Sequence, residues 1–101
     1  MKLCDVVNDG NKDKALCLKG LPFRVQKNEI KEFFAEVCDV PEDNIHIAEE
    51  EGRRSGNGLC VFESEDQAQE VKGALNRKEI GGRFIILIDQ NDRMWEQLVA
   101  A

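Results

Sequence analysis

The chain has 101 residues, of which 42% are hydrophobic and 34% are charged. This length suits a single domain with one modest core, and the apolar share is enough to fold without a metal ion or disulfide bonds. The formal charge of −6 argues against a protein that binds polyanions non-specifically through a strongly basic face. It leaves room for a small site in which a few arginines cluster.

The first half of the chain predicts a strand and a helix. Residues 1–14 are mostly polar, and we expect them to form a flexible tail or a weak hairpin, with the domain proper at residues 15–101. Residues 15–19 predict a short apolar strand that ends at the Gly-Leu-Pro of residues 20–22. The helix that follows has apolar residues at i, i+3, i+4 and i+7, which puts them on one face: Ile30, Phe33, Phe34 and Val37.

The next part of the chain predicts two strands and a second helix. Residues 44–48 and 57–63 predict the strands, and the charged run at residues 49–56 predicts a long hairpin loop between them. Ser64 and Gln67 have the spacing of a capping box, which predicts the start of a helix. The expected inner face of this helix is Ala68, Val71, Ala74 and Leu75.

The chain ends with another strand and a third helix. A Gly-Gly pair at residues 81–82 predicts a turn, and residues 83–88 predict the last strand. Within residues 91–99, four apolar side chains share one helical stripe: Met94, Trp95, Leu98 and Val99.

The order β-α-β-β-α-β predicts an α+β protein with a ferredoxin-like fold. Such a fold has a four-stranded antiparallel sheet with both long helices on one face, and here it carries an extra C-terminal helix. Right-handed crossovers place the four strands in the spatial order 4-1-3-2. In this topology three loops meet at one end of the sheet: the loop after the first strand, the hairpin between strands two and three, and the loop before strand four.

Histidine and cysteine are too scattered to predict a catalytic or metal site. The cysteines, Cys4, Cys17, Cys38 and Cys60, lie far apart, and His46 is the only histidine. We expect Cys17, Cys38 and Cys60 to be reduced and mostly buried, and His46 to be structural. Residues 23–28 have neither the Cys-x-x-Cys of a copper chaperone nor the glycines of an acylphosphatase-like phosphate cradle. We therefore expect no enzyme and no cofactor.

Positive charge and aromatic rings concentrate in the three loops. The residues are Phe23 and Arg24 in the first, Arg53 and Arg54 in the second, and Arg83 and Phe84 at the end of the third. Such side chains suit a single-stranded nucleic acid, because guanidinium groups hydrogen-bond phosphates and base edges while rings stack on bases. The alternative for any one of these arginines is a solvated surface position.

Two segments resemble the paired short motifs of the RNA recognition motif, or RRM. They are residues 16–21 and 55–62, and the glycines at 56 and 58 and Phe62 agree well with the family pattern. An ordinary RRM has stacking aromatic residues where this chain has Cys17, Asn57 and Leu59. The usual binding of bases on the sheet surface is therefore not expected here.

Further segments resemble the quasi-RRMs of the heterogeneous nuclear ribonucleoprotein F and H family, which enclose guanine-rich single strands with loops. These segments are residues 20–23, 51–56, 63–66, 82–84 and 94–95. The resemblance implies that Phe23, Arg53, Arg83 and Phe84 bind single-stranded RNA, and we add Arg24 and Arg54 from charge alone. It also implies a monomeric domain that acts in pre-mRNA splicing or other RNA processing, with ribonucleoprotein partners.

The sequence further predicts that the open face of the sheet is covered. Alternation puts an apolar surface there that is too large to leave exposed, and we expect the C-terminal helix to dock on it through Met94, Trp95 and Leu98. No long apolar run begins the chain, so we expect no signal peptide, no membrane span and an intracellular location, the nucleus rather than the cytoplasm. The alternative function is a protein-interaction RRM that acts as a scaffold through its acidic helix faces, without RNA contact.

Overall fold

The structure is a computed structural model that describes residues 7–8, 10–22, 24–50 and 53–100, without the side chains of residues 49–50, 53–55 and 100. Four strands form one sheet in the order β2-β3-β1-β6. They are β1 (Ala15–Lys19), β2 (Ile45–Glu50), β3 (Arg53–Val61) and β6 (Ile86–Ile88). All neighbouring strands are antiparallel. The predicted ferredoxin-like fold and the 4-1-3-2 strand order are confirmed, with β6 as the fourth strand.

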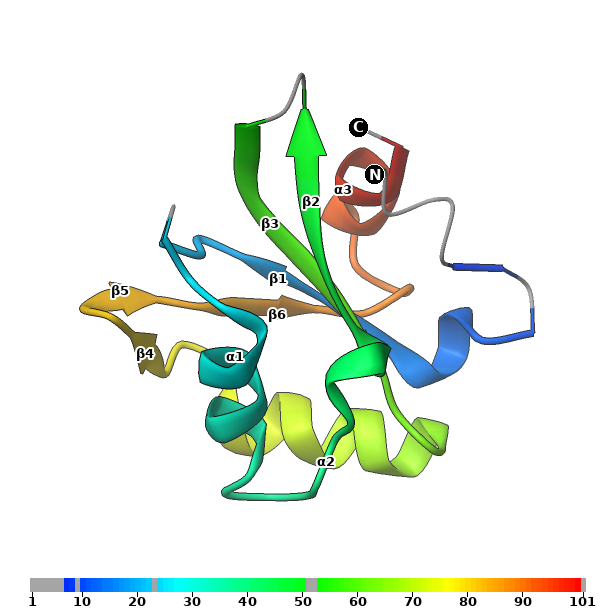
Figure 1. Cartoon of the computed structure of the whole chain (residues 1–101). Coiled ribbons are helices and arrows are strands. Elements are labelled where there is room, and N and C mark those ends of the chain that lie inside the picture. The colour runs from blue at the N-terminus through cyan, green and yellow to red at the C-terminus, as the bar shows by residue number, and fades with distance from the viewer. Residues whose placement is uncertain (1–6, 9, 23, 51–52, 101) are drawn as a thin grey trace.

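Helices cover both faces of this sheet (Figure 1). They are α1 (Lys27–Phe34) and α2 (Glu65–Leu75) on one face, and α3 (Met94–Ala100) on the other. Side chains of a strand alternate between the two faces, so each strand contributes to two apolar clusters. In β1, Leu16 and Leu18 pack toward α1 and α2, whereas Cys17 packs toward α3. No helix of the described residues is long and apolar enough to cross a membrane.

The first helix ends earlier than its apolar pattern predicts. Ile30 and Phe34 are buried, but α1 stops at Phe34, and Val37 packs against the core from the turn that follows. Phe33 is only half-buried and meets the ring of Phe34 edge-on, with centroids 5.4 Å apart.

The predicted cap of the second helix is present in α2. Ser64 Oγ accepts a hydrogen bond from the Gln67 N–H at 3.1 Å, and Gln67 Oε1 accepts one from the Glu63 N–H at 3.1 Å. The reciprocal bond thus reaches one residue further back than in the standard capping box. Ala68, Val71 and Leu75 are buried as predicted. Ala74 is exposed, so its assignment to the inner face was wrong: it lies at the margin of the apolar stripe.

The segment before β1 contains a short helix where a tail or weak hairpin was expected. Lys12–Lys14 form the 3-10 helix η2. The Lys14 carbonyl accepts a hydrogen bond from the Phe62 N–H at 2.8 Å, and Val7 packs against the apolar cluster under α3.

The predicted long loop at residues 49–56 is wrong, because β2 and β3 continue as a ribbon. The register places Glu49 opposite Arg54 and Glu50 opposite Arg53, after a shift between Ile47 and Glu49. Opposite charges across an antiparallel pair favour strand pairing. In the sequence the same residues read as a charged loop.

The predicted last strand at residues 83–88 is divided in two. Arg83–Phe84 form β5, which pairs with β4 (Glu79–Ile80) in a separate two-stranded hairpin. Ile85 separates the two strands: its N–H donates to the Lys78 carbonyl at 2.8 Å. The fourth strand of the main sheet, β6, then begins at Ile86.

Candidate nucleic-acid interface

The loop after β1 contacts both β3 and the β4–β5 hairpin at one end of the sheet, as the topology predicts. The N–H groups of Gly20 and Leu21 both donate to the carbonyl oxygen of Gly56, at 3.0 and 2.8 Å. A Cβ placed on Gly20 would lie only 2.8 Å from the carbonyl oxygen of Phe84, and one placed on Gly81 would lie 3.3 Å from Pro22 Cγ. We call this end of the sheet, formed by residues 19–22, 24–25 and 77–84, the loop rim.

Buried residues anchor the loop rim and hold neighbouring side chains outward. Leu21 and Val25 anchor the loop after β1, and Ile80 anchors the hairpin. Arg83 is exposed on the hairpin, and Phe84 beside it is 64% exposed. A ring on a short, anchored hairpin presents its face to a ligand without first having to be ordered.

The loop rim gathers some of the predicted site residues, while others lie beyond it. Arg24, Arg83 and Phe84 are exposed at the rim. Phe23 lies outside the described residues. Arg53 and Arg54 belong to the β2–β3 ribbon, and their side chains are not described.

The ribbon overhangs the rest of the sheet. The last pairing of β3 with β1 joins Asn57 to Lys19, so Arg53 is four residues further along the strand. At about 3.3 Å per residue, this places its backbone about 13 Å beyond Asn57. Figure 1 shows the end of the ribbon and the β4–β5 hairpin as separate projections. A ligand that contacts Arg53 and Arg83 together must therefore span from one projection to the other.

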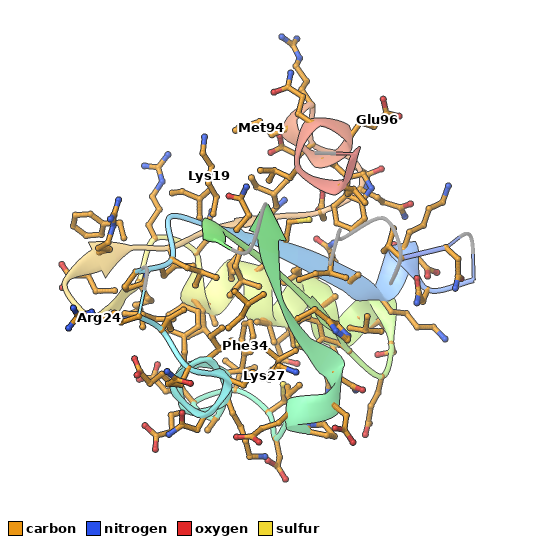
Figure 2. The ribbon with its side chains drawn as sticks, turned by 45° about the horizontal axis from the view of Figure 1, so that its top comes forward. Lys19, Arg24, Lys27, Phe34, Met94 and Glu96 are labelled. Carbon is orange, nitrogen blue, oxygen red and sulfur yellow. The ribbon has the colours of Figure 1, made fainter. Side chains whose placement is uncertain are left out.

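Lys19 is a candidate binding residue that the sequence analysis did not select. It ends β1, pairs with Asn57 and Ile86 on its two sides, and is exposed. Its Nζ lies 4.0 Å from Met94 Sδ, and Figure 2 shows it pointing to the side of the sheet on which α3 lies, away from Phe34. Alternation from Cys17 indicates this face, so a signal was present in the sequence.

The part of the sheet on which ordinary RRMs stack bases lies under α3. Cys17 and Leu59 pair across β1 and β3, are fully buried, and share an apolar cluster with Trp95, which is 6% exposed. Leu98 belongs to the same cluster, and Met94 packs at its edge. Burial raises the pKa of the Cys17 thiol to about 12. Asn57, the third of these positions, is half-buried.

A buried carboxylate ties the segment before α3 to α2. Asp89 Oδ2 accepts hydrogen bonds from Lys72 Nζ at 2.9 Å and Gln69 Nε2 at 3.1 Å, and Oδ1 accepts one from the Asn91 N–H at 3.0 Å. Burial by itself raises the pKa of Asp89, but these hydrogen bonds and the charge of Lys72 outweigh it and lower the pKa. The carboxylate is therefore charged and satisfied at neutral pH.

The pKa values of the described cysteines and of His46 are shifted mainly by burial. Burial raises the pKa of the Cys60 thiol, and burial together with nearby carboxylates raises that of Cys38. Cys17 and Cys60 are free and buried, as predicted, whereas Cys38 is half-buried. Burial, and then the charge of Lys27, lowers the pKa of His46. Within the described part of the chain, no three His, Cys, Asp or Glu side chains are grouped to hold a metal ion.

Charge is separated along the molecule. At the loop rim the exposed basic residues are Lys19, Arg24, Arg77, Lys78 and Arg83, with Glu79 among them. At the opposite end, the exposed acidic residues are Glu36, Asp39, Glu42, Asp43, Glu63, Glu65 and Asp66. A domain with a net charge of −6 therefore has a locally basic end.

Comparison with known proteins assigns the family. Residues 16–86 match the RNA recognition motif. RNA-binding protein 12B of Homo sapiens is 32% identical over 81 residues, which are 78% of this chain and 8% of that protein. Heterogeneous nuclear ribonucleoprotein F of Bos taurus is 33% identical over 81 residues, 80% of this chain and 18% of that protein. The chain thus spans only a small part of these relatives.

Solved structures of quasi-RRMs have the same fold. The Glorund qRRM2 domain superposes with a TM-score of 0.67 at 28% identity. The aligned region covers 83% of this chain and 96% of the Glorund domain. The G-rich RNA sequence binding factor 1 of Homo sapiens superposes with a TM-score of 0.68 at 25% identity, over 85% and 88% of the two chains. The chain therefore belongs to the RNA recognition motif family, a family of RNA-binding domains rather than of enzymes, and it resembles the quasi-RRMs of heterogeneous nuclear ribonucleoproteins F and H.

Proposed function

We propose that this domain binds a short, guanine-rich single strand of RNA at the loop rim, without catalysis. The observation that carries the proposal is the contrast between the two possible surfaces. The stacking positions Cys17 and Leu59 are buried under α3. The Phe84 ring is 64% exposed beside Arg83, on an anchored hairpin at the basic end of the domain.

Each proposed binding side chain, at the rim or on the ribbon, has a role that fits its chemistry. Phe23 and Phe84 stack on bases or flank them, because an aromatic face accepts any base. Arg53 and Arg83 donate to base edges and phosphates, with Arg24 and Arg54 adding positive charge. Lys19, which is exposed at the end of β1, neutralises a phosphate. The β2–β3 ribbon and the β4–β5 hairpin approach the bound RNA from two directions.

The preference for guanine is supported by two lines of argument. One relative of known structure has the name G-rich RNA sequence binding factor 1. A guanidinium group can also donate two hydrogen bonds to O6 and N7 of guanine, which no other base accepts in that geometry. The resemblance to heterogeneous nuclear ribonucleoprotein F supports the proposal of a nuclear role in splicing or other RNA processing, with ribonucleoprotein partners.

An NMR titration with G-rich, U-rich and A-rich oligonucleotides tests this proposal. We expect the largest shifts with the G-rich strand, at Lys19, Arg24 and the hairpin of residues 79–84. Shifts confined to the middle of the sheet around Cys17 and Leu59, with Lys19 and the hairpin unchanged, would contradict binding at the loop rim. No shift with any of the three would refute RNA binding and leave the scaffold role.

A further inference from the structure

Gly20 lies where two parts of the loop rim come closest. Its φ of +92° is in the left-handed region that favours glycine. A Cβ at this position would lie 2.8 Å from the carbonyl oxygen of Phe84, a distance that real Cβ atoms essentially never show. The atom that it meets is backbone, so no rotation of a flexible side chain can relieve the contact. Any other residue at position 20 must therefore move one of the two segments.

The surroundings decide which segment moves. On one side, Gly20 and Leu21 are fixed by two hydrogen bonds to the Gly56 carbonyl, and Leu21 is buried. On the other side, Ile85 is fully buried, and its carbonyl accepts a hydrogen bond from the Arg77 N–H at 2.8 Å. Between these fixed points, Phe84 is exposed, and its strand partner among the described residues is Glu79 of the two-residue strand β4. The segment with the fewest constraints between these points is Arg83–Phe84, the strand of the hairpin that faces Gly20.

We propose that Gly20 is a positioning residue for RNA binding, which sets where Arg83 and Phe84 stand relative to Lys19 and the loop after β1. This inference rests on the proposed function. Hydrogen bonds and stacking contacts tolerate displacements of only about 0.5 Å. Close passage of the Phe84 backbone over Gly20 keeps the hairpin side chains and Lys19 within reach of one strand.

The first test compares Gly20→Ala with Gly56→Ala. Gly56 has a similar φ of +85°, but a Cβ there would meet only the Leu21 carbonyl oxygen, at an ordinary 3.6 Å. Both variants impose left-handed strain, and only the first forces the hairpin to move. We expect Gly20→Ala to weaken binding of a G-rich oligonucleotide by about tenfold, since such sites need geometry to about 0.5 Å. Gly56→Ala should weaken it by less than about threefold. An equal loss in both would overturn the proposal.

A second test separates positioning from general destabilisation. In the Arg83→Ala/Phe84→Ala background, the side chains that Gly20 positions are gone, so Gly20→Ala should reduce RNA affinity by less than about twofold further. The same loss in both backgrounds would contradict the proposal. If Gly20→Ala does not fold, Gly20→Asn serves instead, because asparagine tolerates a positive φ better while its Cβ still meets the Phe84 carbonyl.

A third measurement needs no RNA. Amide spectra of free Gly20→Asn should show their main changes at residues 83–85, and those of free Gly56→Ala should not. If the wild-type domain bound no RNA, the proposed function would fail, whereas these spectra would still report whether Gly20 positions the hairpin. An unchanged hairpin in Gly20→Asn would refute the positioning role itself.

Discussion

The carboxylate of Asp89 lies 2.9 Å from Nζ of Lys72, and this ion pair joins the segment before α3 to α2 on the far side of the sheet. The Asp89 side chain is 9% exposed and that of Lys72 29% exposed. Two independent interactions therefore place α3: this ion pair in the segment that leads to it, and the apolar cluster of Trp95, Leu98 and Val99 along its length.

Lys72→Met should destabilise the domain by about 1–2 kcal/mol, because it removes a charged hydrogen bond from a carboxylate that stays buried. Urea unfolding measures the change. Asp39→Ala is the control, since it removes only the partner of Lys31 in an ion pair whose carboxylate is 91% exposed. A surface pair of this kind should cost less than about 0.5 kcal/mol. Equal losses in the two variants would contradict the role given to Asp89.

Acid should weaken the fold through Asp89. Its pKa is lowered in the folded state from an ordinary value of 3.8. The unfolded chain therefore takes up the proton first, so the stabilisation is present above pH 3.8 and is lost as the pH falls through the lower folded value. Unfolding measured from pH 6 to pH 2 should show a flatter profile for Asp89→Asn than for the wild type. Parallel pH profiles for Asp89→Asn and the wild type would contradict this role of Asp89.

Trp95→Ala should lower the free energy of unfolding by about 2–3 kcal/mol, from the lost apolar burial. For a domain of this size the melting temperature should then fall by about 10 °C. Glu96→Ala, at the exposed neighbouring position, is the control and should leave the melt unchanged. A melt of Trp95→Ala like that of the wild type would mean that α3 contributes nothing to stability.

Phe84→Leu should weaken RNA binding while leaving stability almost unchanged, because the ring is 64% exposed and contributes little to the core. Loss of one base-stacking contact costs about 1–3 kcal/mol of binding free energy. Fluorescence anisotropy with a labelled G-rich oligonucleotide measures it. Leucine keeps the apolar bulk, so an unaltered affinity would exclude stacking on this ring.

Salt should weaken RNA binding only moderately. With about three phosphate contacts on a single strand, the slope of log K against log salt should be about −2. Arg83→Gln should make this slope shallower by about 0.7 if Arg83 neutralises a phosphate. An unchanged slope with lower affinity would instead assign Arg83 to a base edge.

Local signals predicted the fold well. The capping box at Ser64 is a contact between residues three apart, and it correctly marked the start of α2. Alternation along residues 85–88 also matches the structure, in which Ile85 and Leu87 pack on one face of the sheet and Ile86 and Ile88 on the other. Both signals depend on short spacings, which the sequence displays directly.

The misses came from strand pairings and close backbone contacts that no regular spacing in the sequence marks. The charged residues of the β2–β3 ribbon are paired across strands, and a single sequence does not show that Glu50 lies opposite Arg53. The break at Ile85 depends on its hydrogen bond to Lys78, which forms only when the β4–β5 hairpin folds. Gly20 could be recognised as a turn residue, but its closeness to the Phe84 carbonyl is visible only in three dimensions.

The separation of charge along the domain has a kinetic consequence. Among the described residues, a basic rim opposite an acidic end makes the charge distribution asymmetric, which favours orientations in which the rim faces a polyanion. An approaching RNA strand is attracted to the basic rim and repelled by the acidic end. If RNA binds at the rim as proposed, this asymmetry favours encounters at low ionic strength that begin with the rim facing the RNA.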